Sequence, residues 1–203
     1  MRLSQLTPIP RAFYNRDPRI VGRDLLGKVL LRREGRATLA GRIVECEAYL
    51  GAGDPAAHSA SGKTARNAVL FGPPGYAYVY FIYGNHWCLN VSCLPDGEAG
   101  GILFRALEPL AGIDRMAATR QLEPSQLRLI ASGPGRLAEA LAITRQRDNG
   151  KDFASPKSDL RIVDDGFHVE NIQESPRIGI RKAMDLPLRY TIDGSPFISG
   201  KRP

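Results

Sequence analysis

The first half of the chain carries apolar patterns that are typical of β-strands, in which apolar residues alternate with polar ones or form short continuous runs. Strands are predicted over residues 28–32, 39–49 and 102–107. The segment 51–74 has no such pattern and is rich in turn-forming and polar residues. It is therefore predicted to be a long functional or surface loop.

The clearest hairpin pattern lies in the middle of the chain. Residues 76–83 are rich in aromatic and β-branched side chains, a Gly-Asn pair supplies a tight turn, and residues 87–93 return as the partner strand. Tyr80 and Tyr83 are three residues apart, so on a regular strand they point to opposite faces. Tyr83 is predicted at the exposed tip, where core packing does not explain a large aromatic side chain.

Helical patterns lie mainly in the second half, with one early exception. Asp17 followed by Pro18 predicts a helix start, with Asp17 as the N-cap, and the helix would run to about residue 26. Further helices are predicted over roughly residues 109–120 and 134–143, and short strands over 160–163 and 188–192. The absence of a repeat or a linker favours one α+β domain, residues 1–203, with a mainly antiparallel sheet.

The net charge adds a candidate partner to this picture. The 203 residues carry a formal net charge of +7, which attracts polyanions such as the DNA backbone, although basic termini alone could produce the same number. No apolar run approaches the roughly 20 residues that span a bilayer, and the first residues contain no apolar signal core. We therefore expect a soluble protein of the cytoplasm, or of the nucleus in a eukaryote, with no membrane partner.

Cysteine and histidine spacing argues against a metal site. The three cysteines are odd in number and form no C-x-x-C pair, which is untypical of a disulfide scaffold, a zinc site or an iron–sulfur cluster. The three histidines have no metal-type spacing, and His58 lies alone in the predicted long loop. The prediction is that the protein binds neither a metal ion nor another cofactor.

Two carboxylates and a tyrosine share one face of the strand predicted over residues 39–49. Side chains alternate along a strand, so Glu45, Glu47 and Tyr49 point the same way. Such a face is either solvated or lines a site, and this segment alone favours a solvated face because charged residues mostly lie outside. The hairpin favours a site, since a tip aromatic can enter a duplex while Tyr80 stacks on an extruded base. For Tyr76 and Tyr78 ordinary β-propensity and core packing are favoured.

Taken together, these segments resemble the alkyladenine (3-methyladenine) DNA glycosylase family of the small single-domain type. The resemblance covers nearly the whole chain, and the runs occur in the order of the family. The matching runs are RIVECEAYLG (residues 42–51), AAHS (56–59), TARN (64–67), YVYFIYG (78–84), RALEPL (105–110), SGPG (132–135), PRIGI (176–180) and GSPF (194–197). The resemblance implies a curved antiparallel sheet with surrounding helices and a protruding β-hairpin.

The resemblance also implies a role for individual residues. Glu47 would be the general base that binds the attacking water, with Arg105 and the backbone carbonyl of Ile178 as the other groups that position this water. A flipped base would be enclosed by side chains of the loop and the strands, and the gap in the duplex would be filled from the hairpin tip. The residues concerned are Tyr49, His58 and Tyr80 around the base, Asn90 on the pocket wall and Tyr83 in the duplex.

The implied reaction is hydrolysis of the N-glycosidic bond of alkylated or deaminated purines in double-stranded DNA. No activated lysine accompanies the site, and Lys63 is predicted to lie in a solvated or phosphate-contacting loop, so we expect a monofunctional enzyme that leaves an abasic site. The acid that a neutral leaving base would need is not identified, since His58 could equally donate to the base or to the sugar–phosphate. The protein is expected to act as a monomer.

Three alternatives stay open. Asn90 could reject the exocyclic amine of guanine, or it could be a polar residue that ties the hairpin together. The whole protein could instead be a non-catalytic protein that recognises distorted DNA through Tyr83, or a hydrolase of nucleosides or RNA bases. Residues 94–101 depart from the family pattern, because this loop is longer and more acidic than expected.

Overall fold

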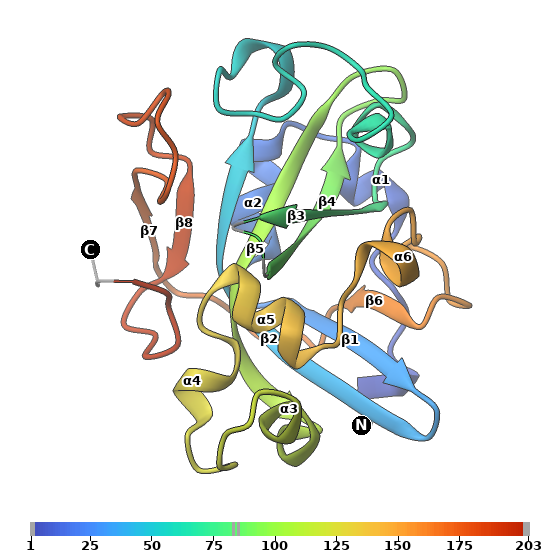
Figure 1. The fold of residues 1–203 in the computed structure, drawn as a ribbon, viewed down its shortest axis with the longest axis vertical. Coiled ribbons are helices and arrows are strands. Elements are labelled where there is room, and N and C mark those ends of the chain that lie inside the picture. The colour runs from blue at the N-terminus through green and yellow to red at the C-terminus, as the bar shows by residue number, and fades with distance from the viewer. Residues whose placement is uncertain (1–2, 83, 85, 201–203) are drawn as a thin grey trace.

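The computed structural model describes residues 3–82, 84 and 86–200, and they build one curved, fully antiparallel sheet. Six strands follow one another in the order β3-β4-β5-β2-β1-β6, while β8 pairs with β2 and β7 pairs with β8. The two longest strands, β2 and β5, run through the centre of the molecule (Figure 1). The strands are β1 (Val29–Glu34), β2 (Ala37–Tyr49), β3 (Ala77–Ile82), β4 (His86–Cys93), β5 (Gly100–Ala111), β6 (Leu160–Val163), β7 (Ile172–Ser175) and β8 (Arg189–Ile192).

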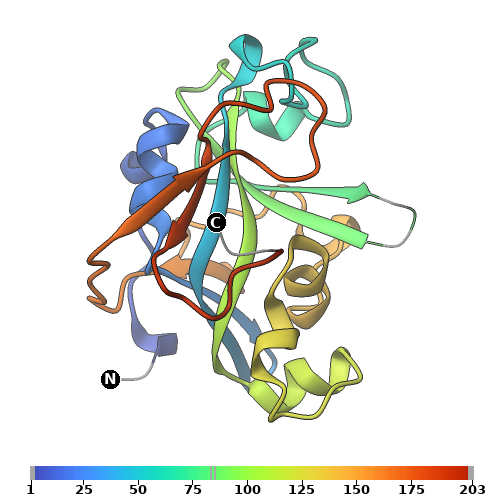
Figure 2. The ribbon, with the colours of Figure 1, turned by 90° about the vertical axis from the view of Figure 1, so that its left-hand side faces the viewer.

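Short helices cover both faces of the central strands. Helix α2 lies behind β2 and β5 in Figure 1 and α5 lies in front of them, and the turned view of Figure 2 separates the two helices in the same way. The hairpin of β3 and β4 protrudes from the body of the molecule in Figure 2. The α-helices are α1 (Arg11–Tyr14), α2 (Pro18–Leu25), α3 (Ile113–Thr119), α4 (Leu127–Ala131), α5 (Pro134–Ala140) and α6 (Arg145–Asp148), and the 3-10 helices are η1 (Leu3–Gln5), η2 (Gly51–Gly53) and η3 (Ala68–Phe71).

The predicted fold class is therefore confirmed: an α+β architecture with a curved antiparallel sheet, surrounding helices and a protruding hairpin. The predicted start of α2 is also confirmed, because the side chain of Asp17 accepts a hydrogen bond from the backbone N–H of Arg19 at 2.8 Å. This N-cap satisfies a donor that the first turn of a helix leaves without an intrahelical partner. Within the described part of the chain, no helix is long and apolar enough to cross a bilayer.

The helix predicted over residues 109–120 is wrong in its first part, because β5 continues to Ala111. Pro109 stays in the strand beside a register shift, where Gly41 faces Pro109 and the preceding residue of β2, Ala40, faces Ala111. A bulge of this kind tolerates a proline, which cannot donate a ladder hydrogen bond. The chain then turns at Gly112, whose φ of 70° is in the left-handed region, and α3 begins at the next residue.

The outer edge of β3 is covered by the segment that follows α6. The side-chain oxygen of Asn149 accepts a hydrogen bond from the backbone N–H of Val79 at 3.0 Å. Two backbone hydrogen bonds join Ala77 to the same segment, one from Gly150 at 2.7 Å and one to the carbonyl of Lys151 at 2.8 Å. These contacts occupy backbone groups that an edge strand otherwise leaves open to pairing.

Candidate active site

The two carboxylates of β2 lie inside the molecule. Glu45 and Glu47 point to the same face of β2, as predicted, but both are 0% exposed. The interpretation of this strand face as solvated is therefore wrong, and the alternative that the face belongs to a site is favoured. A buried carboxylate needs charged or hydrogen-bonding partners, and both glutamates have them.

Three donors surround the carboxylate of Glu47. Oε1 lies 3.1 Å from Nη1 of Arg105 and accepts a hydrogen bond from the backbone N–H of Ile178 at 2.7 Å. Oε2 accepts a hydrogen bond from the hydroxyl of Tyr49 at 3.0 Å. Burial raises the pKa of Glu47 above its usual range, and the three partners act in the opposite direction by stabilising the ionised form. The result is an oriented carboxylate of increased basicity.

Glu45 anchors the arginine that reaches Glu47. Its Oε1 accepts a hydrogen bond from Nε of Arg105 at 2.8 Å, so one guanidinium group bridges the two carboxylates. Arg189 and the hydroxyl of Ser199 also donate to Oε1, at 2.8 and 2.9 Å. These roles could not be predicted from the sequence, because Arg189 and Ser199 are more than 140 residues from Glu45 and only the folded chain brings them there.

An open cavity of about 540 Å³ lies over this cluster. Six residues that were predicted to belong to the site line it, and Glu47 lies buried behind them, in contact with three of them. The cavity is also lined by His86 and Cys88, and by Gly100 and Gly101 at the end of the segment that departs from the family pattern. Tyr78, for which core packing was favoured, packs in a buried cluster with Tyr80 and lines the cavity as well. The six predicted residues are Tyr49, His58, Tyr80, Asn90, Arg105 and Ile178.

An aromatic wall forms one side of the cavity. The rings of His58 and Tyr80 meet edge to face with centroids 4.4 Å apart, and those of Tyr78 and Tyr80 are 5.6 Å apart. Nδ1 of His58 lies 3.1 Å from the hydroxyl of Tyr78. Burial and the nearby Arg66 lower the pKa of His58, which favours a neutral imidazole at neutral pH. The alternating positions of Tyr78 and Tyr80 could have identified both as wall residues, since they share one face of β3.

The other predicted site residues have different outcomes. Tyr83 lies outside the described residues, so its predicted place in the duplex stays a prediction. Asn90 faces Tyr78 across the hairpin and donates to its carbonyl at 3.1 Å, and it lines the cavity as well, so both of its proposed roles stay open. Lys63 is exposed and does not line the cavity.

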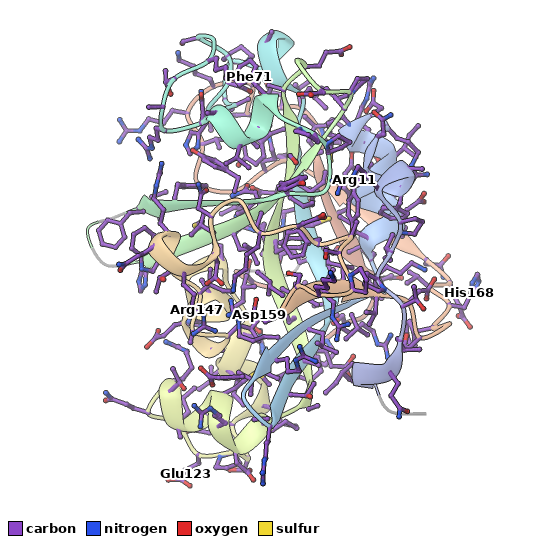
Figure 3. All side chains as sticks on the ribbon, turned by 90° about the vertical axis from the view of Figure 1, so that its right-hand side faces the viewer. Arg11, Phe71, Glu123, Arg147, Asp159 and His168 are labelled. Carbon is purple, nitrogen blue, oxygen red and sulfur yellow. The ribbon has the colours of Figure 1, made fainter. Side chains whose placement is uncertain are left out.

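Among the residues that the structure describes, histidines and cysteines form no metal cluster. His58 and His86 line the cavity, whereas His168 lies on the side of the molecule opposite to the hairpin (Figure 3). No group of three or more histidine, cysteine or acidic side chains within residues 3–82 and 86–200 could hold a metal ion. The three cysteines are all buried and have free thiols.

Comparison with known proteins identifies the family of this chain. Residues 12–196 match the family model described as methylpurine-DNA glycosylase (MPG). The chain belongs to this family. The glycosylase is 84% identical over 200 residues to a protein of Koribacter versatilis (strain Ellin345), covering 98% of this chain and 97% of the relative.

Two further relatives come from other organisms. A protein of Burkholderia cenocepacia (strain HI2424) is 48% identical over 97% of this glycosylase and 93% of its own length. A protein of the Methanoculleus marisnigri strain ATCC 35101 / DSM 1498 / JR1 is 48% identical over 94% of this glycosylase and 98% of its own length. All three relatives bear the name "Putative 3-methyladenine DNA glycosylase". Membership confirms the enzyme class expected from the sequence and contradicts the non-catalytic alternative.

Proposed function

We propose that this glycosylase removes 3-methyladenine, other alkylated purines and deaminated purines from double-stranded DNA. The damaged nucleotide rotates out of the duplex into the cavity, and a water molecule activated by Glu47 hydrolyses its N-glycosidic bond. The products are the free base and an abasic site, with no Schiff base and no strand cleavage. The enzyme works in the cytoplasm as a monomer and needs no cofactor.

The observation that carries this proposal is the position of Glu47. Its carboxylate is 0% exposed, lies directly behind the cavity wall, and is oriented by three donors from separate parts of the chain. A carboxylate buried this deeply has no access to a base inside a duplex, so the nucleotide must leave the stack, at a cost of a few kcal/mol. Tyr83 at the hairpin tip would offset part of this cost by filling the vacated space.

The chemistry of the site suits a reaction that develops positive charge on the sugar. Ionised Glu47 can stabilise an oxocarbenium-like transition state and accept a proton from the attacking water. Arg105 and the backbone carbonyl of Ile178 would hold this water, while the backbone N–H of the same Ile178 holds the carboxylate. A cationic base such as 3-methyladenine leaves readily without protonation.

Selectivity for damaged bases would come from the aromatic wall and the duplex. The rings of Tyr49 and Tyr80 line the cavity, and an aromatic face attracts a cationic alkylated purine more strongly than a neutral one. His58, as a neutral imidazole, would add a hydrogen bond to the base or to the sugar–phosphate. Damaged or mismatched bases are also less costly to extrude than paired ones.

The test is single-turnover incubation with duplexes that carry one hypoxanthine or one methylated purine, with and without a chelator. The wild-type enzyme should release the damaged base and cut no strand before alkali, and Glu47→Gln should bind both duplexes but release base at least about 10²-fold more slowly. Release by Glu47→Gln at the wild-type rate would refute the role of Glu47. Preference for free nucleosides or single-stranded RNA would favour the nucleoside or RNA base hydrolase.

A further inference from the structure

A buried ion pair packs against the ring of Tyr49 without lining the cavity. The side chains of Arg177 and Asp54 are both 0% exposed and form a bidentate pair with N···O distances of 2.5 and 2.9 Å. Arg177 also donates to the backbone carbonyl of Ala48 at 3.0 Å. Its guanidinium carbon lies 4.6 Å from the centre of the Tyr49 ring, and neither charged residue lines the cavity.

This pair contacts both of the uncharged groups that donate to Glu47. The ring of Tyr49 rests on the guanidinium group, and its hydroxyl donates to Oε2 of Glu47. Ile178 directly follows Arg177 in the chain, and its backbone N–H donates to Oε1 of Glu47. Asp54 in turn accepts from the backbone N–H groups of two loop residues, Leu50 and Ala56, so the pair connects the end of β2, the loop and the segment of Ile178.

We propose that Arg177, held by Asp54, is the positioning residue for the general base of this glycosylase. It fixes the Tyr49 ring and sets the Ile178 N–H against Glu47, so that the carboxylate stays oriented toward the water-binding position. The proposal rests on the proposed role of Glu47, and no function was predicted for Arg177 or Asp54 from the sequence. Removing the pair should loosen both donors, lower the rate of the chemical step and raise the pKa of Glu47.

The chain offers a control pair of similar geometry away from the cavity, although its side chains are 10% and 20% exposed. Arg42 forms a bidentate pair with Asp165, with N···O distances of 3.0 and 2.9 Å. It also donates to the backbone carbonyl of Gly27 at 2.7 Å, and its guanidinium carbon lies 3.9 Å from the centre of the Phe167 ring. The side chain of Asp165 also accepts from a backbone N–H two residues further on, as that of Asp54 does. No member of this second pair lines the cavity or contacts Glu47.

The experiment compares two double variants, Asp54→Asn/Arg177→Met and Arg42→Met/Asp165→Asn. Each removes both charges, so that neither leaves an unpaired charge in the interior. Single-turnover excision is measured across pH with enzyme in excess of a duplex that carries one methylated purine, beside wild type and Glu47→Gln. The variant of the Arg177 pair should be roughly 10- to 100-fold slower, with the acidic limb of its profile moved up by roughly one pH unit. The control variant should keep the wild-type midpoint.

A purely structural role for the pair predicts a different outcome. If the Arg177 variant keeps the wild-type midpoint, or loses no more rate than the control variant, the positioning role is overturned. Arg177→Lys keeps the buried charge opposite Asp54 but loses the planar guanidinium group. It should therefore raise the midpoint of the acidic limb, by less than the double variant does. This variant tests the proposal even if the double variant does not fold. Wild-type activity in Glu47→Gln would instead refute the proposed function, whatever the Arg177 variants show.

Discussion

At the scale of single residues, the hydroxyl of Tyr49 is expected to tune the base strength of Glu47. Burial raises the pKa of Glu47, so the ionised fraction, and with it the excision rate, rises with pH through a midpoint above the usual range of a glutamate. The hydroxyl lowers this pKa by donating to the ionised form. Tyr49→Phe should therefore move the midpoint up by about 0.4 to 1 pH unit, since a hydrogen bond contributes about 0.5–1.5 kcal/mol and one pKa unit is about 1.4 kcal/mol.

The measurement is the single-turnover release of a cationic methylated purine across acidic and neutral pH. Tyr76→Phe is the matched control, because Tyr76 lies outside the cavity and its ring packs against Arg11. A midpoint that does not move in Tyr49→Phe would show that the hydrogen bond to Glu47 does not control its ionisation.

Some residues of the site could be predicted from the sequence and others could not. Tyr49 and Tyr80 lie in recognisable runs, so their place around one cavity, with Glu47 in contact with Tyr49, could be predicted from the resemblance. The ion pair of Arg177 and Asp54, which is proposed to position Glu47, could not be predicted. Its two residues are 123 positions apart and meet only in the folded chain. The strand segment taken alone favoured a solvated face for Glu45, and this was wrong because the distant cationic partners that make its burial possible are not visible in the segment.

At the scale of elements, the segment after α6 is expected to stabilise the edge strand that carries the aromatic wall. Asn149→Ala removes the acceptor of the Val79 backbone N–H and should lower the free energy of unfolding by about 1–2 kcal/mol. Asn149→Asp keeps an acceptor oxygen in the same place and should retain most of that stability. Chemical denaturation of the three proteins measures the difference, and equal losses in both variants would exclude the hydrogen bond as the cause.

Elements were predicted well where local chemistry determines them. The N-cap of α2 and the aromatic hairpin are encoded within a few residues, and the cap and the two paired strands of the hairpin have the predicted form. The helix predicted from Pro109 was wrong because a bulge opposite β2 allows the proline to remain in β5, and bulges depend on the partner strand. Strand β7, whose residues are mostly exposed, has no apolar pattern to identify it and forms by pairing with β8.

At the scale of the whole molecule, the net charge of +7 should make binding to duplex DNA strongly dependent on salt. Each phosphate that the protein neutralises releases condensed counterions, so affinity falls as a power of the salt concentration. With roughly four to five phosphate contacts, the affinity for a lesion duplex should fall by about 10²- to 10³-fold between about 50 and 200 mM salt. Fluorescence anisotropy with Glu47→Gln measures this without turnover. A change of less than about tenfold would mean that the basic charge is not gathered on the DNA-binding face.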